Sequence, residues 1–552
     1  RVGVEVARGC TRGCRFCQAG MIYRPYRERS LDEVLDTFGR ALRETGYDTL
    51  AMTALSTTDL TYLHELVGAL ACPSREISVS IPSLRVEGIT EEVARIIASV
   101  RKPGFTMAPE AATGRLRDVI NKGNTEEDLF RSADIIKRLG WRSLKLYFMV
   151  GLPTEQDEDV EAICSLAAEL ARRFRGNVTV SVSCFVPKSF TPFQWEAQIA
   201  IERYREILSF LKGRLKHRNV TLKWHDPRLS FLEGVFARGD GRLARVLEEA
   251  LSRGAYLDGW GDALAENAWT DAFETCGIEP AAYLGPRSTE TALPWDFIDM
   301  RIDKDFLLEE RAKAHAGTST PDCRRGPCVM CGACGEGLGN VLRPQTGCRP
   351  LFAGESPLGA YPYVIGITKE DELRYLSPRE FQEMIRRAVR RCGLDAVYSQ
   401  GFSPVMKLSA TPPPSHGVAS LCEYVQIELK HPMDPETIRQ RLDACLPRGS
   451  RAFTCREGKL SKVRSYTYTT CRPFTLALDP GETLRKGNIL LRVSDFLEHV
   501  GPTTLRIAFR EGRTISPVAL LNAFSPDRFG CEEIVKTAVC FSDDEEGECG
   551  AP

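Results

Sequence analysis

The chain has 552 residues, of which 43% are hydrophobic and 27% are charged, and this length predicts two to four domains. Its formal net charge of −1 argues neither for nor against a nucleic acid as partner. No apolar run reaches the roughly 18 residues that a membrane helix needs, and no signal peptide is visible. We therefore expect a cytoplasmic protein that does not enter a membrane.

Strand-like and helical runs alternate over residues 1–215. The strand-like runs are VGVEVA, TLAMTAL, ISVSIP, FTMAP, SLKLYFMV and VTVSVSCFV, and they are nearly continuous in apolar residues, as in parallel strands covered on both faces. Six βα units in series predict an α/β fold, either a parallel sheet or a partial, TIM-like (β/α)6 barrel. In both cases the chemistry belongs at the carboxyl ends of the strands.

The rest of the chain divides into four segments. Residues 216–345 are helical and then loop-rich, and residues 346–360 form a Gly- and Pro-rich linker. Residues 361–462 predict the order βαββαβ, which is ferredoxin-like. Residues 463–552 form a strand-rich subdomain, interpreted as a degenerate repeat of the preceding one, with an acidic tail.

Twenty cysteines are many for a chain of this size, and seven of them form two tight groups. In large domains such grouping favours metal binding in the cytosol over a disulfide framework. The first group is Cys10, Cys14 and Cys17, which directly follows the first strand-like run. Three thiolates can bind three irons of a [4Fe–4S] cube and leave the fourth iron open to another molecule, whereas zinc wants four ligands, or three and a water.

The stretch CTRGCRFC, with aromatic Phe16 before the last cysteine, resembles the signature of radical S-adenosylmethionine (SAM) enzymes. The resemblance implies that the open iron chelates SAM and that one electron cleaves the sulfonium. It also implies a 5′-deoxyadenosyl radical that abstracts hydrogen from the substrate. The cofactor supplies this chemistry, and the protein positions it. An electron donor of the flavodoxin or ferredoxin type is implied as a partner.

The resemblance also implies cofactor-binding positions after the later strands. The turn LSTTD, with Ser56, Thr57 and Thr58, stands where such enzymes carry a Gly-rich turn for the methionine end, but it lacks the glycines. Further candidates are Glu110 and Arg115 after the fourth strand and Gly151 after the fifth. On the substrate side, Lys188, Thr191 and Trp195 either line the site or pack the barrel mouth.

Over nearly the whole chain, the stretches APEAATGRLRDVINKG, FVPKSFTPFQW and YLDGWGD resemble an uncharacterised bacterial radical SAM family related to methylthiotransferases and, more distantly, to cobalamin-dependent enzymes. That family often carries a cobalamin-binding-like domain before the barrel. Because the sequence begins at Arg1 inside a strand-like run, we expect a missing N-terminal part. Cobalamin is thus conceivable through that part, although no residue of this sequence supports it.

The second cysteine group is Cys323, Cys328, Cys331 and Cys334, with Cys348 as a spare ligand. Its C-x2-C-x2-C run resembles ferredoxin-type ligation. A structural zinc is the alternative, although this spacing is tight for one tetrahedral site. The group therefore predicts a second iron–sulfur cluster or zinc. The pair His225–Asp226 could supply a base or ligand, or be structural.

The stretch LRYLSPREFQEMIRRAVRRCGL followed by YSQGFSPVMKLS resembles a domain linked to radical SAM enzymes. Its basic helix end and nearby aromatic residues predict a surface that binds RNA by phosphate contacts and base stacking, or else a solvated face that complements the helix dipole. The candidate residues are Arg386, Arg387, Arg390, Arg391, Tyr398, Phe402 and Lys407.

The sequence thus predicts a radical SAM enzyme that transfers a methyl or methylthio group to tRNA or rRNA. One alternative is a cobalamin-dependent radical SAM enzyme that acts on a small molecule. The other is a non-catalytic iron–sulfur protein that binds RNA, which the glycine-poor LSTTD turn favours.

Overall fold

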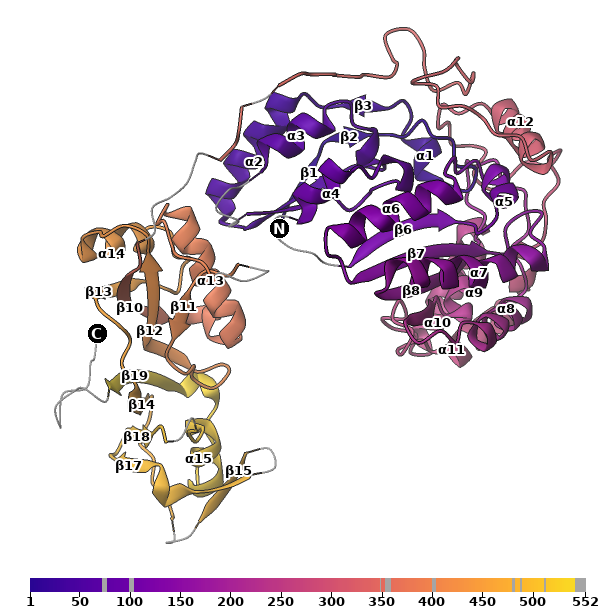
Figure 1. The fold of residues 1–552 in the computed structure, drawn as a ribbon. Helices are drawn as coiled ribbons and strands as arrows, with labels where there is room; N and C mark the ends of the chain where they lie inside the picture. Colours follow the sequence, from indigo (N-terminus) through magenta and orange to yellow (C-terminus); the bar gives the residue numbers. More distant parts are fainter. Residues whose placement is uncertain are drawn as a thin grey trace.

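The computed structural model describes residues 1–71, 77–98, 104–347, 349–352, 359–399, 404–478, 482–486, 489–510 and 513–541. Figure 1 shows two bodies, one built from the elements up to α12 and one from the strands β10 to β19. Within the described ranges, no helix combines the length and apolarity needed to cross a membrane.

The N-terminal body contains two parallel sheets, and its mixed α/β class is as predicted. One sheet has the order β1 (Val2–Glu5), β4 (Thr49–Thr53), β5 (Ser78–Ser80), and the other has the order β6 (Phe105–Glu110), β7 (Ser143–Val150), β8 (Asn177–Cys184), β9 (Val220–Trp224). The six predicted strand runs all form strands. A further strand, β9, extends the second sheet past residue 215, where the sequence had ended the barrel.

Helices alternate with these strands and lie around their outside (Figure 1). They are α2 (Leu31–Thr45), α3 (Leu63–Ala69), α4 (Glu91–Ala98), α5 (Gly114–Val119), α6 (Glu126–Arg138), α7 (Asp157–Phe174) and α8 (Ile201–Arg214). The capping boxes read from the sequence are formed: Ser30 caps α2 with Glu33, and Thr125 caps α6 with Asp128. Each such cap contributes about 1 kcal/mol.

Strands β7 and β8 form the centre of the larger core. They pair in register over eight positions, from Ser143↔Asn177 to Val150↔Cys184. Alternate side chains of β7, including Leu144, Leu146 and Phe148, are fully buried beneath α6 and α7, and each such burial contributes about 1.5–3 kcal/mol. This platform fixes the loops at the carboxyl ends of the strands, where the candidate site lies.

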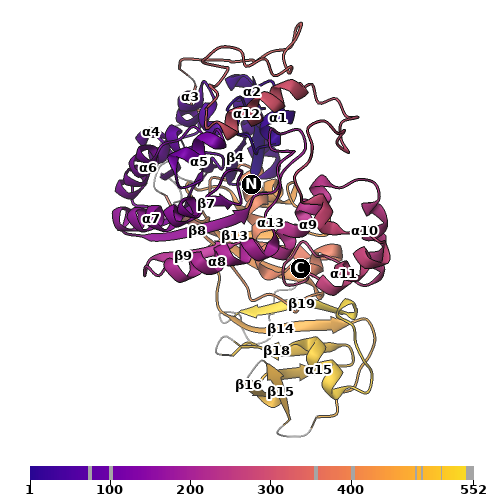
Figure 2. The same ribbon diagram turned by 90° about the vertical axis from the view of Figure 1, so that its right-hand side faces the viewer.

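Between the two bodies of strands the chain is helical and then irregular. Helices α9 (Pro227–Arg238), α10 (Leu243–Ser252) and α11 (Glu266–Thr275) lie together (Figure 2) and share a small core. Helix α12 (Lys304–His315) follows, and the long loop after it carries the second cysteine group.

The first half of the C-terminal body has the predicted element order βαββαβ. The elements are β10 (Tyr361–Lys369), α13 (Pro378–Arg391), β11 (Leu408–Ala410), β12 (Ala419–Leu429), α14 (Pro435–Asp443) and β13 (Ala452–Glu457). The sheet order is β13-β10-β12 with β11 against β12, and the pairs are antiparallel. If β10, β11, β12 and β13 are numbered 1 to 4 along the chain, their order in the sheet is 4-1-3-2.

The second half repeats this strand order. Strands β14 (Val463–Thr470), β17 (Leu497–Val500), β18 (Thr504–Ala508) and β19 (Ile534–Phe541) lie in the order β19-β14-β18-β17, again 4-1-3-2. Helix α15 (Pro517–Phe524) precedes β19, while a hairpin of β15 (Thr483–Lys486) and β16 (Ile489–Arg492) stands where the first helix would be. Parallel pairing of Ala419 with Val535 joins the halves, so one sheet crosses residue 462, where we had divided the domains.

Candidate active site

The first cysteine loop connects two short paired strands at the end of β1. Strand β2 (Ala7–Arg8) pairs with β3 (Arg27–Glu28), and α1 (Ala19–Ile22) follows the loop. Gly9 has φ +87°, and a Cβ there would lie 2.6 Å from the carbonyl oxygens of Tyr23 and Pro25. Only glycine therefore fits at the entrance to the loop.

The three thiols of this loop are neighbours and half-buried. Burial, followed by the charge of Cys14, raises the pKa of Cys10 to about 11, and the same two causes raise the pKa of Cys17. The Cys14 Sγ accepts a hydrogen bond from Arg85 Nη1 at 3.8 Å. The Gly20 N–H donates to the Cys17 Sγ at 3.4 Å.

The donor set fits an iron–sulfur cluster, because three soft thiolates lie on one loop beside a cation. Among the described residues, no three His, Cys, Asp or Glu side chains form a group that could hold a metal ion as they stand. The fit therefore depends on the chemistry of the donors and not on a preformed cage.

Glu110 and Lys122 form an ion pair next to this loop. The Lys122 Nζ lies 3.0 Å from Glu110 Oε1 and 5.9 Å from the centre of the Phe16 ring. Glu110 ends β6 with φ +66°, a left-handed conformation that costs a non-glycine residue about 1–2 kcal/mol. Two residues beyond Lys122, the Asn124 amide is buried, and both its polar atoms lack a hydrogen-bond partner. The sequence analysis had missed Lys122 and Asn124, although both lie in or next to the stretch that it quoted.

The LSTTD turn forms a short 3-10 helix, Thr57–Asp59. Thr58 Oγ1 accepts from the Arg85 backbone N–H at 3.3 Å and lies 3.4 Å from Ser56 Oγ. The Thr57 hydroxyl is fully buried without a hydrogen-bond partner. Since a buried unpaired hydroxyl costs about 1–3 kcal/mol, Thr57 is the residue of this turn that most needs a ligand.

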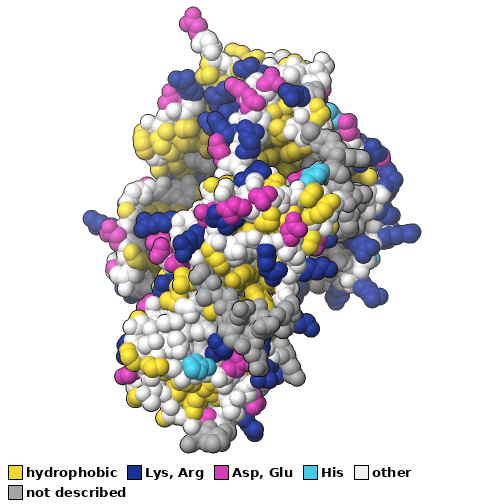
Figure 3. All heavy atoms as spheres, turned by 90° about the vertical axis from the view of Figure 1, so that its left-hand side faces the viewer, with side chains coloured by type: hydrophobic (Ala, Val, Ile, Leu, Met, Phe, Trp, Pro, Cys, Tyr) yellow, Lys and Arg dark blue, Asp and Glu magenta, His cyan; other side chains and the backbone are white. Residues whose placement is uncertain are grey.

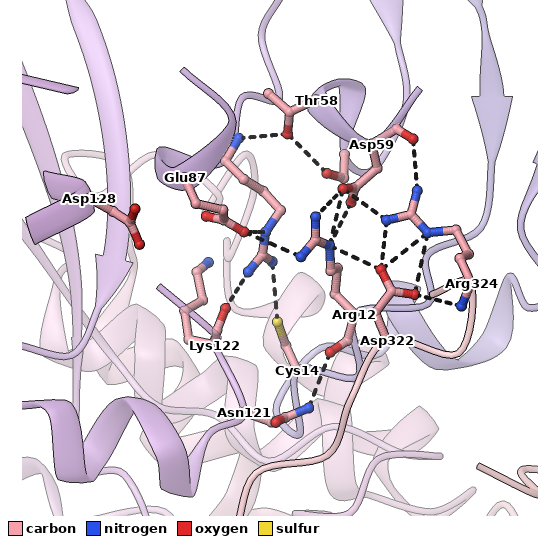
Figure 4. A network of polar contacts seen from close by, with 12 residues as sticks. Arg12, Cys14, Thr58, Asp59, Glu87, Asn121, Lys122, Asp128, Asp322 and Arg324 are labelled. Atoms are coloured by element: carbon pink, nitrogen blue, oxygen red, sulfur yellow. Dashed lines mark hydrogen bonds and ion pairs between the residues drawn. The ribbon is translucent and has the colours of Figure 1, made fainter. Parts of the chain in front are cut away.

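Asp59 is the centre of an ion network that the sequence did not predict (Figure 4). Its carboxylate pairs with Arg12 and, at 2.9 Å, with Arg324 Nη2. Asp322 also contacts both guanidinium groups, at 3.4 Å from Arg12 Nε and 2.6 Å from Arg324 Nη2. Burial alone would raise the pKa of Asp59, but the hydrogen bond and charge of Arg12 and the charge of Arg324 bring it well below its ordinary value.

Two other cofactor candidates lie near one another on α5 and the β7 loop. Arg115 is exposed and pairs with Asp159, with its Nη2 also donating to Thr154 O at 3.0 Å. Gly151 has φ +81°, and its N–H donates to Glu155 Oε1 at 2.8 Å. Burial raises the pKa of Glu155 to about 7, although backbone hydrogen bonds oppose the rise.

The substrate candidates at the end of β8 are held by intramolecular contacts. Lys188 Nζ pairs with Glu233 at 2.5 Å, and Thr191 Oγ1 donates to Lys188 O at 2.7 Å. Trp195 is fully buried, and its indole N–H has no hydrogen-bond partner. Trp195 packs in an apolar cluster with Trp295 and Phe306; packing was one of the two roles predicted for it.

In the His225–Asp226 pair, Asp226 has a structural contact, and the contact of His225 is made by its backbone. His225 N–H donates to Val182 O at 3.0 Å next to the β8–β9 pairing, and the Asp226 side chain caps α9 by accepting from the Arg228 N–H at 2.9 Å.

The basic end of α13 faces the N-terminal body. Arg387 Nε donates to Thr45 O at 2.9 Å, and its guanidinium lies 4.1 Å from the Tyr47 ring centre. Arg390 donates to Gly46 O at 2.8 Å and to Tyr398 at 3.2 Å. These predicted RNA contacts thus join the two bodies of the chain.

Among the described residues, the other candidates predicted to bind RNA do not contact the N-terminal body in this way. Arg386 lies 3.7 Å from Glu383, and Lys407 pairs with Glu428 at 2.9 Å. The Arg391 Nε is buried without a hydrogen-bond partner. Phe402 lies outside the described residues, as does Cys348.

The second cysteine group lies on the loop after α12. Cys331 is buried, whereas Cys328 and Cys334 are exposed. Burial raises the pKa of Cys334, and the charges of Cys331, Cys323 and Cys328 raise it further. The four side chains therefore share one electrostatic neighbourhood.

The class of site is thus a loop of three thiols at a strand end of a parallel α/β domain, beside buried polar groups, and its donor set suits an iron–sulfur cluster. The comparisons with known proteins agree with this class. Residues 4–167 match the model of the radical SAM superfamily, and residues 363–488 match an uncharacterized protein family conserved in bacteria, DUF2344. The chain therefore contains a radical SAM domain and, after it, a DUF2344 domain.

Individual relatives cover parts of the chain. An uncharacterized protein of Methanocaldococcus jannaschii is 32% identical over 245 residues, 44% of this chain and 53% of that protein. The ribosomal protein uS12 methylthiotransferase RimO of Caldicellulosiruptor saccharolyticus is 24% identical over 255 residues, 43% of this chain and 55% of that enzyme. The chain spans about half the length of these curated relatives.

Among solved structures, the radical SAM enzyme coproporphyrinogen III oxidase of Escherichia coli has a TM-score of 0.26 and 15% identity. The match covers 38% of this chain and 51% of that enzyme. With a TM-score this low, the family assignment comes from the sequence matches.

Proposed function

We propose that this protein uses a [4Fe–4S] cluster and SAM to generate a 5′-deoxyadenosyl radical. Cys10, Cys14 and Cys17 would hold the cluster, which when bound to SAM supplies an electron that cleaves the sulfonium. The observation that carries the proposal is the single loop of three neighbouring thiols, with Arg85 donating to the Cys14 sulfur.

The chain's own residues provide the environment of this reaction. Arg85 donates a hydrogen bond to the Cys14 sulfur, and the Lys122–Glu110 pair places a cation and a carboxylate beside Phe16. The Asp59 carboxylate already forms ion pairs with Arg12 and Arg324. The Thr57 hydroxyl and the backbone of its turn, rather than that carboxylate, are therefore the groups in this turn available for the methionine end of SAM.

For the group transferred, we propose methyl or methylthio. Three of the similar proteins are named as methylthiotransferases of ribosomal protein uS12, at 24%, 21% and 22% identity. We propose RNA, tRNA or rRNA, as the substrate, and an electron donor of the flavodoxin or ferredoxin type as a partner.

Arg387 and Arg390 at the end of α13 contact the N-terminal body. A surface that binds RNA therefore has to lie elsewhere on the molecule. On the face drawn in Figure 3, Lys and Arg side chains gather along the right-hand edge, and positive and negative groups mix elsewhere. Such an edge suits phosphate contacts, which do not read sequence.

The first test is anaerobic. The protein is reconstituted with iron and sulfide, SAM and a strong reductant are added, and 5′-deoxyadenosine is measured for the wild type and for Cys14→Ala. We expect product from the wild type only. An intact cluster in the wild type that yields no product would contradict the proposal and favour the iron–sulfur RNA-binding alternative.

The substrate is tested separately in cells that lack the protein. Nucleosides from bulk RNA and intact masses of ribosomal proteins are compared with those of the parent strain by mass spectrometry. A missing modified nucleoside supports RNA, whereas a ribosomal protein lacking a methylthio group contradicts RNA and supports a protein substrate.

A further inference from the structure

The proposed function leaves the loop of Cys323, Cys328, Cys331 and Cys334 without a role. The backbone of this loop is shaped around its sulfur atoms. The Met330 N–H donates to the Cys328 Sγ at 3.4 Å, and Met330 has φ +50° although its side chain is 76% exposed. A left-handed backbone conformation costs a non-glycine residue about 1–2 kcal/mol, and the exposed Met330 side chain gains no core packing that would offset this cost. We take the conformation as a constraint imposed by the neighbouring thiols.

Other elements hold the remaining sulfur atoms in place. Asn340 Nδ2 donates to the Cys323 Sγ at 3.6 Å. Cys331 packs in an apolar cluster with Met21 of α1 and Phe306 of α12, and its carbonyl accepts from the Asp303 N–H at 3.0 Å. The loop is thus docked on the helix that directly follows the first cysteine loop.

An unpaired cation lies beside these thiols. Arg24 Nε donates to Gly20 O at 3.0 Å, but the buried Arg24 Nη1 has no hydrogen-bond partner. The Arg24 guanidinium lies 5.5 Å from the centre of the Phe306 ring, in the apolar cluster that also contains Cys331. A buried unpaired guanidinium nitrogen is costly, and a group of thiolates would offset that cost.

We propose that Cys323, Cys328, Cys331 and Cys334 ligate a second iron–sulfur cluster, held against the first cysteine loop. The spacing favours iron–sulfur over zinc, because two residues separate Cys331 from Cys328 and two separate it from Cys334. Successive C-x2-C pairs that share a ligand are typical of ferredoxin-type clusters, while structural zinc sites commonly use two separate pairs.

The two cysteine loops are joined by the network of Figure 4. Arg12 lies between Cys10 and Cys14 in the sequence, Asp322 and Arg324 flank Cys323, and the contact between Arg12 and Asp322 is 3.4 Å. Asn121 adds neutral links, donating to Arg12 O at 3.1 Å and accepting from the Thr320 N–H at 2.9 Å. The second loop is therefore fixed to the first by contacts at residues next to the ligands of both.

The experiment counts metal in the full chain after anaerobic reconstitution. We expect about eight irons per chain in the wild type, about four in Cys10→Ala/Cys14→Ala/Cys17→Ala and about four in Cys328→Ser/Cys334→Ser, if each group holds one [4Fe–4S] cluster. Cys328 and Cys334 are exposed, so their substitution does not disturb a core. Cys471→Ser, at another exposed cysteine, is the matched control and should keep all the iron.

Electron paramagnetic resonance separates the two sites. The reduced triple variant should keep a cluster signal that SAM does not change, while the signal of Cys328→Ser/Cys334→Ser should change when SAM binds. Wild-type protein with four irons and one zinc, with zinc lost in the double variant, would overturn the iron–sulfur assignment. Iron unchanged in the double variant would overturn the site itself. Failure of the proposed function would appear as absent 5′-deoxyadenosine and as a first-cluster signal that SAM does not change, whereas the loss of about four irons in Cys328→Ser/Cys334→Ser would remain.

Discussion

The two cysteine loops of this chain differ in their surroundings. The three thiols of the first loop are half-buried at the strand ends, next to Arg85 and the Lys122–Glu110 pair. In the second loop Cys328 and Cys334 are exposed, and backbone and amide groups approach the sulfur atoms. A half-buried site with ordered charges suits chemistry that must be kept from side reactions, whereas exposed thiols suit exchange of electrons or atoms with a partner.

The largest expected effect comes from cutting the link between the loops. Asp59→Asn removes one charge from a buried network and leaves Arg12 and Arg324 under-compensated, which should cost about 3–5 kcal/mol of unfolding free energy. Chemical unfolding at pH 7 measures the loss. Asp271→Asn, at an exposed pair with Arg253, is the control and should cost under about 1 kcal/mol. Equal losses in both variants would refute the coupling.

The same carboxylate gives the acid dependence of stability. Because the pKa of Asp59 is lower in the folded state than in the unfolded state, its contribution is present above the unfolded pKa of about 3.9 and is lost as pH falls toward the folded value. Asp59→Asn should therefore flatten the decline in stability below pH 4.

A second substitution tests the cation beside the first cysteine loop. Lys122→Met removes the cation beside Phe16 and leaves Glu110 without its partner. We expect the rate of SAM cleavage to fall about 10- to 100-fold, the scale of one lost charged contact, while the iron content stays that of the wild type. Lost iron would instead assign Lys122 to cluster retention.

The pKa of Glu155 gives a pH test at the barrel mouth. Its folded pKa of about 7 lies above the unfolded value of about 4.3, so the folded state binds more protons between these values and loses stability as pH rises through that window. Glu155→Gln should remove this slope and be more stable than the wild type by about 1–2 kcal/mol at pH 8. Parallel unfolding curves of the two proteins from pH 5 to pH 8 would show the prediction to be wrong.

The smallest effect is expected at the second loop. Asn340→Asp removes the amide donor to the Cys323 sulfur, a contact of about 1 kcal/mol, and keeps an oxygen for the Tyr26 N–H. It should speed release of iron to a chelator by a few-fold. The iron retained by the first loop, measured in the Cys328→Ser/Cys334→Ser background, should not change.

Local features were predictable from the sequence, and long-range contacts were not. The caps at Ser30 and Thr125, the six strand runs and both cysteine groups follow from spacing over a few residues. The contact of Arg12 with Asp322 joins residues about 300 positions apart. Neither local sequence contains a pattern that predicts this pairing. Strand β9 was missed because its residues alternate between half-buried and exposed positions instead of forming an apolar run.

The repeated 4-1-3-2 sheet has a consequence for shortened versions of the protein. The last strand, β19, lies between β12 and β14 at the middle of the sheet, although the DUF2344 match ends at residue 488. A chain cut after that residue would lose β17, β18 and β19, so that β12 and β14 would become open edges exposed to self-association. Truncation at residue 541 is the shortest that keeps this sheet whole.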